Sequence, residues 1–170
     1  MIEIRKEQPL DITPIREVHI RAFGQSQEAD IVDQLRQNCN DLLSFVAILG
    51  NQVVGHILFS PATIEGQGRN VSGMALAPMA VMPDCQRQGV GSELVRAGIS
   101  KLGNKQCPFV LVLGHAEYYP RFGFEPASLY GIRSEWEVPD ETFMILVLSE
   151  AEMKGVSGVA KYRQEFDEAL

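Results

Sequence analysis

The stretch that decides the fold runs Met79-Ala80-Val81-Met82-Pro83-Asp84-Cys85-Gln86-Arg87-Gln88-Gly89-Val90-Gly91-Ser92. An apolar, strand-like run ends at Pro83, a polar turn follows, and Gly89 and Gly91 open a helix-like segment. A turn of this kind leaves backbone N–H groups unpaired at the start of a helix, with no bulky side chains in the way. The helix dipole adds an attraction for negative charge of about 0.3–1 kcal/mol at an exposed site. The stretch therefore predicts a strand, a turn and a helix whose junction suits a pyrophosphate.

Arg87 lies within this turn and can add a charge-assisted contact to a phosphate. The pattern is not a P-loop, which ends in Gly-Lys-Ser or Gly-Lys-Thr. It is not the GxGxxG turn of dinucleotide-binding proteins either. Taken alone, the turn fits equally well with a glycine-rich connection that binds nothing.

Hydrophobic periodicity predicts the elements around this stretch. Strand-like runs fall at 2–4, 43–49, 52–60, 71–82, 109–113 and 143–148. Helical spacing runs from a start signal at Asp11 or Thr13 to Gly24, over 26–38 and over 89–102, and 117–122 forms a short helix or turn. Gly50-Asn51 predicts a hairpin, and Pro78 predicts a bulge or a splayed edge. Residues 126–139 fit no element, and the polar tail 149–170 is predicted to be helical over 161–170.

Composition narrows the class of protein. With 170 residues, 45% hydrophobic and 22% charged, the sequence predicts one domain of ordinary soluble type. A net charge of -7 argues against a nucleic-acid partner. We expect no membrane partner, since there is no apolar run of about 20 residues and the N-terminus lacks a signal-peptide core. Three widely spaced cysteines predict a reducing cytoplasm, and three scattered histidines lack metal-ligand spacing.

A second motif follows the apolar run 109–113: Leu113-Gly114-His115-Ala116-Glu117-Tyr118-Tyr119-Pro120-Arg121-Phe122-Gly123-Phe124. With it, the chain resembles the GNAT superfamily of acyl-CoA-dependent N-acyltransferases. Gln86, Gly89 and Gly91 match the family's Q/R-x-x-G-x-G/A motif. The downstream Tyr-x-x-x-Gly-Phe element is matched by Tyr119, Gly123 and Phe124. The branch it resembles most is a group of small bacterial members with a Tyr-Tyr-Pro-Arg-Phe-Gly-Phe segment and a C-terminal extension.

The resemblance implies an α/β fold of GNAT type. Its sheet would be mixed, mostly antiparallel and twisted, and splayed between two central parallel strands, 71–82 and 109–113, with helices on both faces. The whole chain, 1–170, would form a single N-acetyltransferase domain in which 149–170 is the C-terminal extension. The implied reaction moves an acetyl group from acetyl-CoA, a co-substrate, to a primary amine by direct attack in a ternary complex, with no metal.

Specific roles follow from the same resemblance. The pyrophosphate of CoA would be held at the turn, and the pantetheine arm would contact the main chain of the preceding strand. Acyl transfer to an amine needs a stabilised oxyanion and a protonated leaving thiolate. The Val81 N–H would polarise the thioester carbonyl, and the Tyr119 hydroxyl would protonate the sulfur. The residues assigned to cofactor binding are Met79, Ala80 and Val81 for the arm, and Gln86, Arg87, Gln88, Gly89, Val90, Gly91 and Ser92 for the pyrophosphate.

Several alternatives stay open at this stage. Tyr119 can instead be an aromatic core residue, and a shift of one residue would exchange its role with that of Tyr118. Many family members carry an Asn and a longer helix where this chain has Gly114-His115 close before the tyrosines. The general base is not identified. Its candidates are His19, His56, Glu65, His115 and Glu117.

Two rival functions also fit the motifs. One is a non-catalytic acyl-CoA sensor, which would keep the glycine turn without an acid. The other is a small enzyme that binds a different pyrophosphate ligand, such as a nucleotide. The acceptor is expected to be a small-molecule or peptide amine, chosen by residues 20–40 and 126–142. The resemblance leaves a homodimer open.

Overall fold

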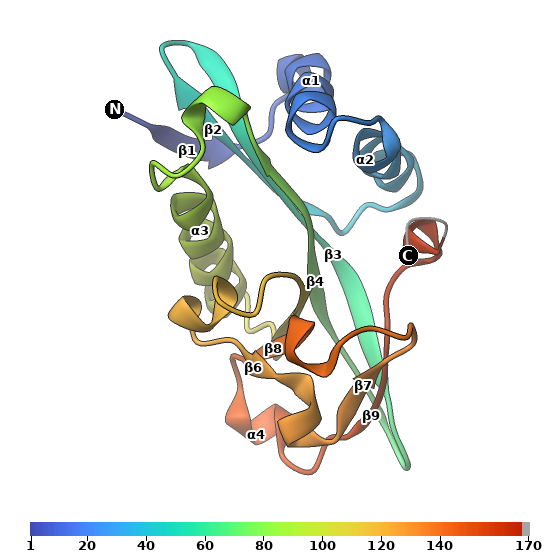
Figure 1. Ribbon diagram of the computed structural model, residues 1–170. Helices are drawn as coiled ribbons and strands as arrows, with labels where there is room; N and C mark the ends of the chain where they lie inside the picture. The colour runs from blue at the N-terminus through green and yellow to red at the C-terminus, as the bar shows by residue number, and fades with distance from the viewer. Residues whose placement is uncertain (168–170) are drawn as a thin grey trace.

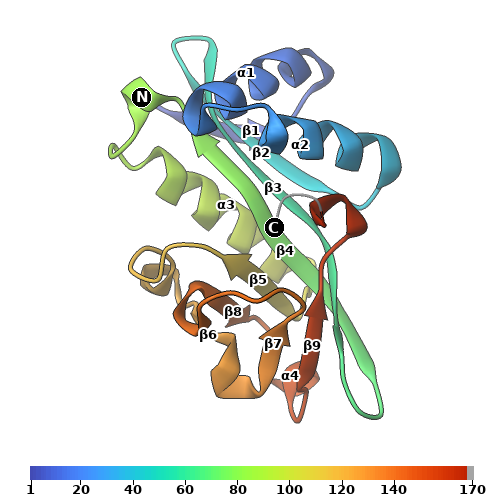
Figure 2. The ribbon, with the colours of Figure 1, turned by 45° about the vertical axis from the view of Figure 1, so that its right-hand side comes forward.

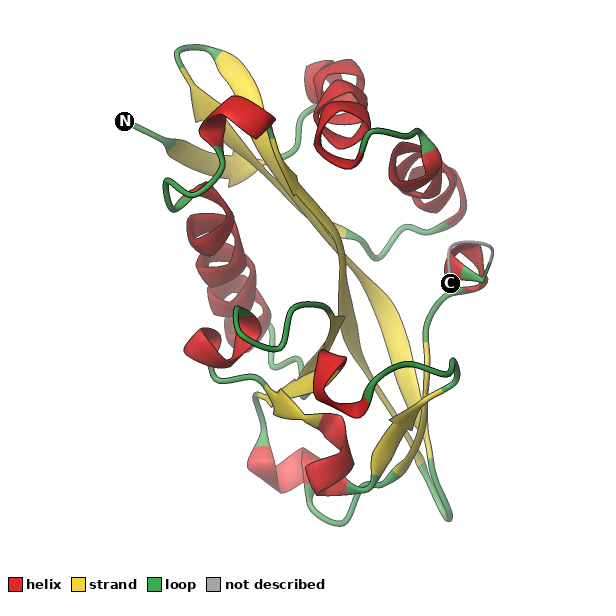
Figure 3. Cartoon of the chain, viewed as in Figure 1, coloured by secondary structure: helices red, strands yellow, loops and turns green. Residues whose placement is uncertain are grey.

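The computed structural model describes residues 1–167 and has a twisted sheet with helices on both sides (Figure 1). The strand order is β1-β2-β3-β4-β5-β8-β6, and β9 pairs with both β3 and β7. Figure 3 shows the two long central strands running diagonally through the molecule. The strands are β1 (Glu3–Lys6), β2 (Leu43–Leu49), β3 (Gln52–Glu65), β4 (Asn70–Val81), β5 (Phe109–Leu113), β6 (Glu125–Pro126), β7 (Ile132–Ser134), β8 (Phe143–Val147) and β9 (Gly158–Lys161). The helices are α1 (Ile12–Phe23), α2 (Gln27–Asn38), α3 (Val90–Asn104) and α4 (Glu150–Met153).

The alternation of side chains along the strands supplies a core to each face. Phe45 of β2 and Ile57 of β3 belong to one cluster, together with Leu94 of α3. The next residue along each strand, Val46 in β2 and Leu58 in β3, belongs to another cluster, which includes apolar residues of α1 and α2. Figure 2 shows α3 on the opposite side of the β3–β4 ribbon from α1 and α2. The expected α/β architecture, a mixed and mostly antiparallel sheet with helices on both faces, is confirmed.

The two central parallel strands separate along their length. β4 and β5 pair at Met74↔Val110, Ala75↔Leu111 and Leu76↔Val112, and the pairing stops there. On the other side of β4, the register with β3 shifts between Ile57 and Phe59, so that Ala77 and Pro78 together lie opposite Leu58. Such a bulge bends the strand, and proline supplies no N–H to the ladder. The bulge and splay expected at Pro78 are therefore present, at the point where β4 leaves β5.

The predicted helix over 161–170 is wrong where the structure describes it, and residues 168–170 lie outside the described residues. Lys161 ends β9, and a short 3₁₀ turn covers Gln164–Phe166. β9 lies antiparallel to the far end of β3, with Thr63 opposite Lys161, and parallel to β7. The prediction failed because β3 continues past residue 60 to Glu65 and offers this edge, which no local pattern in the tail reveals. The unassigned segment 126–139 contains β7.

Candidate active site

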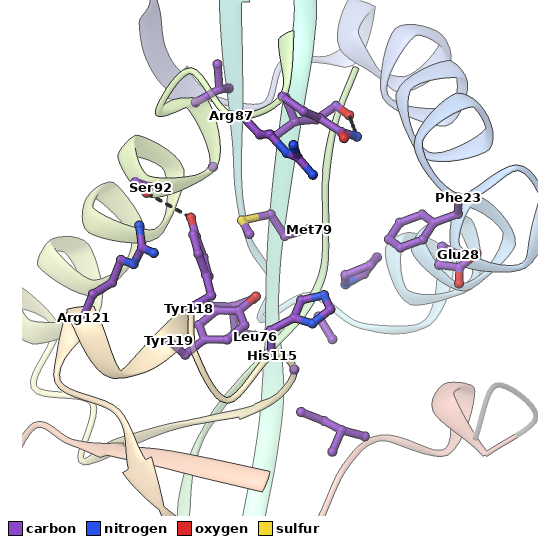
Figure 4. Close-up of a pocket in the computed structure, with 18 of the residues that line it drawn as sticks. Phe23, Glu28, Leu76, Met79, Arg87, Ser92, His115, Tyr118, Tyr119 and Arg121 are labelled. Carbon is purple, nitrogen blue, oxygen red and sulfur yellow. Dashed lines mark hydrogen bonds between the residues drawn. The ribbon is translucent and has the colours of Figure 1, made fainter. Parts of the chain in front are cut away.

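A cleft of about 850 Å³ opens where β4 departs from β5. Five parts of the chain line it: the end of β4, the turn before α3, the segment after β5, the α1–α2 region and the C-terminal segment. Figure 4 shows Tyr118, Tyr119 and Arg121 on one side of this space and Phe23 and Glu28 on the other. Segments that are far apart in the sequence therefore meet at one site.

The turn before α3 presents main-chain donors. Arg87 (φ 64°) and Gly89 (φ 88°) both have left-handed backbone conformations, and Gly89 is the N-cap of α3. The first intrahelical bond runs from the Glu93 N–H to the Gly89 carbonyl, at 3.0 Å. Within residues 1–167, no hydrogen bond engages the N–H groups of residues 87 to 92. These unpaired donors lie at the N-terminus of α3, where the helix dipole also favours negative charge.

Two glutamine side chains hold this turn in shape. Gln86 donates from Nε2 to the Val81 carbonyl at 3.0 Å, and Gln88 donates from Nε2 to the Asp84 carbonyl at 3.2 Å. Both side-chain amides thus form hydrogen bonds within the turn, while the main-chain N–H groups of residues 87 to 92 stay unpaired.

Most of the residues predicted to bind the cofactor line the cleft. Ala80 does not line it, because its side chain is buried on the other side of β4, and neither does Gln88. What the residues do there stays a prediction. Those that line the cleft are Met79, Val81, Gln86, Arg87, Gly89, Val90, Gly91 and Ser92.

The main chain of β4 faces the cleft at Val81. The next residue, Met82, donates its N–H to the Val54 carbonyl of β3 at 2.8 Å. Because successive N–H groups of a strand point to opposite sides, the Val81 N–H points away from β3. The Val81 carbonyl is already bonded to Gln86. This N–H therefore lies on the side where β5 has separated from β4.

The adjacent tyrosines have different surroundings. The Tyr118 hydroxyl lies 3.0 Å from Oγ of Ser92, at the first turn of α3. Tyr119 is buried, and its ring packs on Gly114, where a Cβ would lie only 2.5 Å from Cε2 of the ring. Burial raises the pKa of Tyr119, and the neighbouring Tyr118 raises it further. The Tyr119 hydroxyl is therefore protonated at neutral pH.

Only some of the general-base candidates reach the cleft. His115 is exposed and lines it. Glu117 does not line it, and Glu65 lies at the far end of β3, beside β9. His19 and His56 are completely buried and do not line it either. Among the described residues, the structure thus reduces the five candidates to His115.

His19 and His56 instead belong to a buried polar chain between α1 and the sheet. Nε2 of His19 lies 2.8 Å from Nδ1 of His56, and Nε2 of His56 lies 2.8 Å from Oγ of Ser44. Ser44 donates to Glu7 at 2.7 Å, and Arg36 holds the same carboxylate through two bonds of 3.0 Å. Since Ser44 gives its proton to Glu7, it accepts from His56, which in turn accepts from His19. Both histidines are neutral in this arrangement.

Sequence reasoning missed the side chains that two other regions contribute to the site. Phe23, Glu28 and Ile31 come from the α1–α2 region, and Tyr162 and Phe166 come from the C-terminal segment. The first three fall within residues 20–40, which were expected to choose the acceptor, although no motif marked them as site residues. The last two were hidden by the wrong helix prediction. No residue of 126–142 lines the cleft, although Trp136 packs on Tyr162 with ring centroids 5.0 Å apart.

Two kinds of feature are absent from the described part of the chain. Residues 1–167 contain no group of three His, Cys, Asp or Glu side chains placed to hold a metal ion. None of the helices in that range has the length and apolar character needed to cross a membrane.

Comparison with known proteins gives one answer throughout. The family model described as "Acetyltransferase (GNAT) domain" matches residues 3–127. The uncharacterized N-acetyltransferase YjhQ of Escherichia coli K12 is 46% identical over 134 residues, which is 77% of this chain and 74% of YjhQ. The uncharacterized N-acetyltransferase YhbS of the same strain is 32% identical over 165 residues, 96% of this chain and 98% of YhbS.

Solved structures agree with the sequence relatives. The crystal structure of E. coli YhbS in complex with CoA has a TM-score of 0.90 and 31% identity, and covers 98% of this chain and 92% of its own. A GNAT family acetyltransferase from Brucella melitensis in complex with acetyl-CoA has a TM-score of 0.80 and 32% identity, over 98% and 99% of the two chains. Both of these neighbours therefore carry CoA or its acetyl form.

Proposed function

Because the chain belongs to the GNAT acetyltransferase family, we propose that it transfers an acetyl group from acetyl-CoA to a primary amine by direct attack in a ternary complex. One observation carries the proposal: a row of unpaired N–H groups at residues 87 to 92 borders a cleft that also contains Tyr119. This arrangement suits a long ligand with an anionic end and a reactive end. The CoA and acetyl-CoA of the two structural neighbours are ligands of this kind.

The cofactor would lie along the gap between β4 and β5. Its pyrophosphate would accept hydrogen bonds from the main chain of residues 87 to 92, with Arg87 adding charge. Its pantetheine arm would run beside Met79 and Val81, where β4 is no longer paired with β5. The sulfur end would then reach Tyr119.

The reaction forms a C–N bond and breaks a C–S bond. A neutral amine attacks the thioester carbonyl, and the Val81 N–H stabilises the negative oxygen that develops. The departing thiolate takes a proton from the Tyr119 hydroxyl, which regains one from solvent. An acceptor that arrives as an ammonium ion loses two protons: one replaces the proton given to sulfur, and one is released. Holding both reactants in contact removes the need for a covalent enzyme intermediate.

His115 is the residue we assign as general base. It follows β5, lines the cleft and is exposed, so it can take a proton from the ammonium through water. The remaining parts of the proposal are that the whole chain acts as a single N-acetyltransferase domain in the cytoplasm and that its acceptor is a small-molecule or peptide amine. A homodimer is compatible with this reaction.

The test uses Gly91→Glu. A side chain at position 91 would meet the Tyr118 hydroxyl at 3.2 Å, and a carboxylate there would repel a pyrophosphate. We expect wild-type protein to be stabilised by acetyl-CoA in a thermal-shift assay, because a ligand that binds only the folded state raises the melting temperature. Gly91→Glu should lose this shift, and release of free CoA thiol across a panel of amines should stop with it.

Gly103→Glu is the matched control. It adds the same charge to the same helix, at a site where a Cβ meets nothing within 4 Å. A full acetyl-CoA shift in Gly91→Glu would exclude the turn as the pyrophosphate site. Binding without thiol release on any amine would instead favour the acyl-CoA sensor, and a larger shift with ATP or NAD would favour the nucleotide enzyme.

A further inference from the structure

The charges around the cleft are divided between its sides. Arg87 and Arg121 are the arginines among the lining residues, and Glu28 is the carboxylate. Figure 4 shows Glu28 on the α1–α2 side, across the space from Tyr119 and Arg121. One side of the cleft therefore suits the anionic cofactor, and the other side presents a negative charge.

Glu28 differs from the other acids of its helix. In α2, Asp30 and Asp33 form salt bridges with Arg16 at 2.8 Å, and Asp33 also bonds Arg36. None of the salt bridges among residues 1–167 includes Glu28. Its carboxylate accepts 3.2 Å contacts from the Gln25 side-chain amide at both oxygens. A carboxylate has about four acceptor positions, so Glu28 retains capacity for a cationic ligand.

Apolar side chains line the cleft together with Glu28. Ile31, three residues after Glu28 on the same face of α2, lines the cleft, and so do Phe23 and Phe166. Phe23 is 43% exposed, which is high for a large apolar side chain. An apolar wall that ends in a carboxylate fits a ligand with a hydrocarbon stem and a positive end.

A single amine nitrogen cannot both attack the thioester beside Tyr119 and pair with Glu28. The nitrogen that attacks the thioester must be beside Tyr119 and Val81, whereas Glu28 lies across the cleft from Tyr119. We propose that the acceptor is an amine with a second cationic group, joined to the reactive nitrogen by an apolar stem, and that Glu28 binds this distal cation. This inference rests on the proposed acetyl transfer and adds the substrate class.

Three probes with the same stem of five methylene groups test the inference: 1,5-diaminopentane, hexylamine and 6-aminohexanoate. They differ only in the distal group, which is cationic, neutral or anionic at neutral pH. For wild-type protein we expect kcat/KM to be about five- to tenfold higher for the diamine than for hexylamine, the effect of a half-buried ion pair, and lowest for the amino acid. In Glu28→Gln the three values should lie within about twofold of one another.

Asp30→Asn is the control variant. It removes one negative charge from the same turn of α2, but Asp30 does not line the cleft, so the preference for the diamine should persist. The KM for acetyl-CoA should stay unchanged in both variants. Equal handling of the three probes by wild-type protein, or a diamine preference that survives in Glu28→Gln, would overturn the inference.

A binding measurement separates this inference from the proposed reaction. Calorimetric titration of the three probes into protein saturated with CoA compares their affinities without any turnover. A diamine preference that depends on Glu28 in binding, with no thiol released from acetyl-CoA, would refute the transferase proposal and support the subsite. Thiol release without such a preference would support the transferase proposal and refute the subsite at Glu28.

Discussion

The position of the Tyr119 ring depends on the absence of a side chain at Gly114. The ring occupies the space that a side chain at residue 114 would fill, so Gly114 and Tyr119 are matched in size. The two adjacent tyrosines also differ in their contacts, because the Tyr118 hydroxyl lies within hydrogen-bond distance of Ser92. The proposed role of proton donor can therefore be tested at Tyr119 alone.

Tyr119→Phe should lower kcat by about 10²-fold or more, the usual contribution of a general acid, while the KM for acetyl-CoA changes little. The phenyl ring keeps the packing on Gly114 and loses only the hydroxyl. Steady-state kinetics of the variant and of the wild-type enzyme, both at a saturating amine concentration, measure these two quantities. Tyr130→Phe, at an exposed tyrosine bonded to Glu125, is the control and should behave as wild type. Undiminished turnover in Tyr119→Phe would remove this hydroxyl from the mechanism.

The buried histidines make stability depend on pH. Burial, together with the nearby His56 and Arg36, lowers the pKa of His19 from 6.5 to about 3. Burial also lowers the pKa of His56, against the opposing effect of Glu7. The unfolded chain thus binds more protons than the folded one below about pH 6.5. Stability is fully present above that pH and is lost as the pH falls toward 3.

Urea unfolding at several pH values tests this linkage. The free energy of unfolding should fall below pH 6.5 by about 1.4 kcal/mol per pH unit for each buried neutral histidine. His19→Gln keeps a donor toward His56 but removes one titrating group, so its slope should be shallower by about that amount. An identical slope in the variant would show that His19 does not carry the effect.

At the scale of elements, α3 is held close to the sheet by small residues. A Cβ on Gly55 of β3 would lie 3.0 Å from Val90 and 3.1 Å from Leu94. At Gly98, the ring of Phe59 occupies the place of a side chain. The position of the turn before α3 follows from this packing, because the turn continues directly into the helix.

Gly98→Ala should destabilise the protein by about 1–3 kcal/mol, because the new methyl group collides with the buried Phe59 ring. Gly103→Ala, on the same helix but in open space, should be stabilising by about 0.5–1 kcal/mol through helix propensity. Chemical denaturation of both variants gives the comparison. Equal effects at the two sites would mean that contact with Phe59 does not limit the approach of α3.

Much of the element structure could be predicted from local sequence, and the reasons are specific. The cap at Gly24, the hairpin at Gly50-Asn51 and the glycine turn before α3 each depend on neighbouring residues alone. The cleft residues on β4 and in the turn could be named because they lie beside the motif. Glu28 and Phe166 could not, because they reach the cleft only through the packing of α2 and of the tail. The same dependence explains the missed β9, whose partners are β3 and β7.

At the scale of the whole molecule, the C-terminal segment is part of the main sheet. β9 pairs with the end of β3, and Ala160 of β9 lies in a core cluster with Ile64 and Phe109. Farther along, Glu165 bonds Arg163 at 3.0 Å and Asn38 of α2 at 3.2 Å. The segment therefore links β3 of the sheet to helix α2.

Trp136 is the one tryptophan of the chain, and it packs on Tyr162 of this segment. We expect its fluorescence and the far-ultraviolet circular dichroism to change together during urea unfolding, since a single cooperative unit loses both signals at once. The midpoints should coincide within error. A fluorescence transition at clearly lower urea would mean that the tail detaches before the sheet unfolds.

The short pairing of β4 with β5, three residue pairs long, bears on how such a protein diverges over generations. An opening bordered by backbone groups survives amino-acid replacement, provided that the strand keeps its shape. If the cofactor lies there as proposed, mutation can alter the far wall, on α2 and the tail, while the backbone groups that hold the cofactor stay in place. Descendants of such a protein would then keep one acyl donor and take up different acceptors through small changes in that wall.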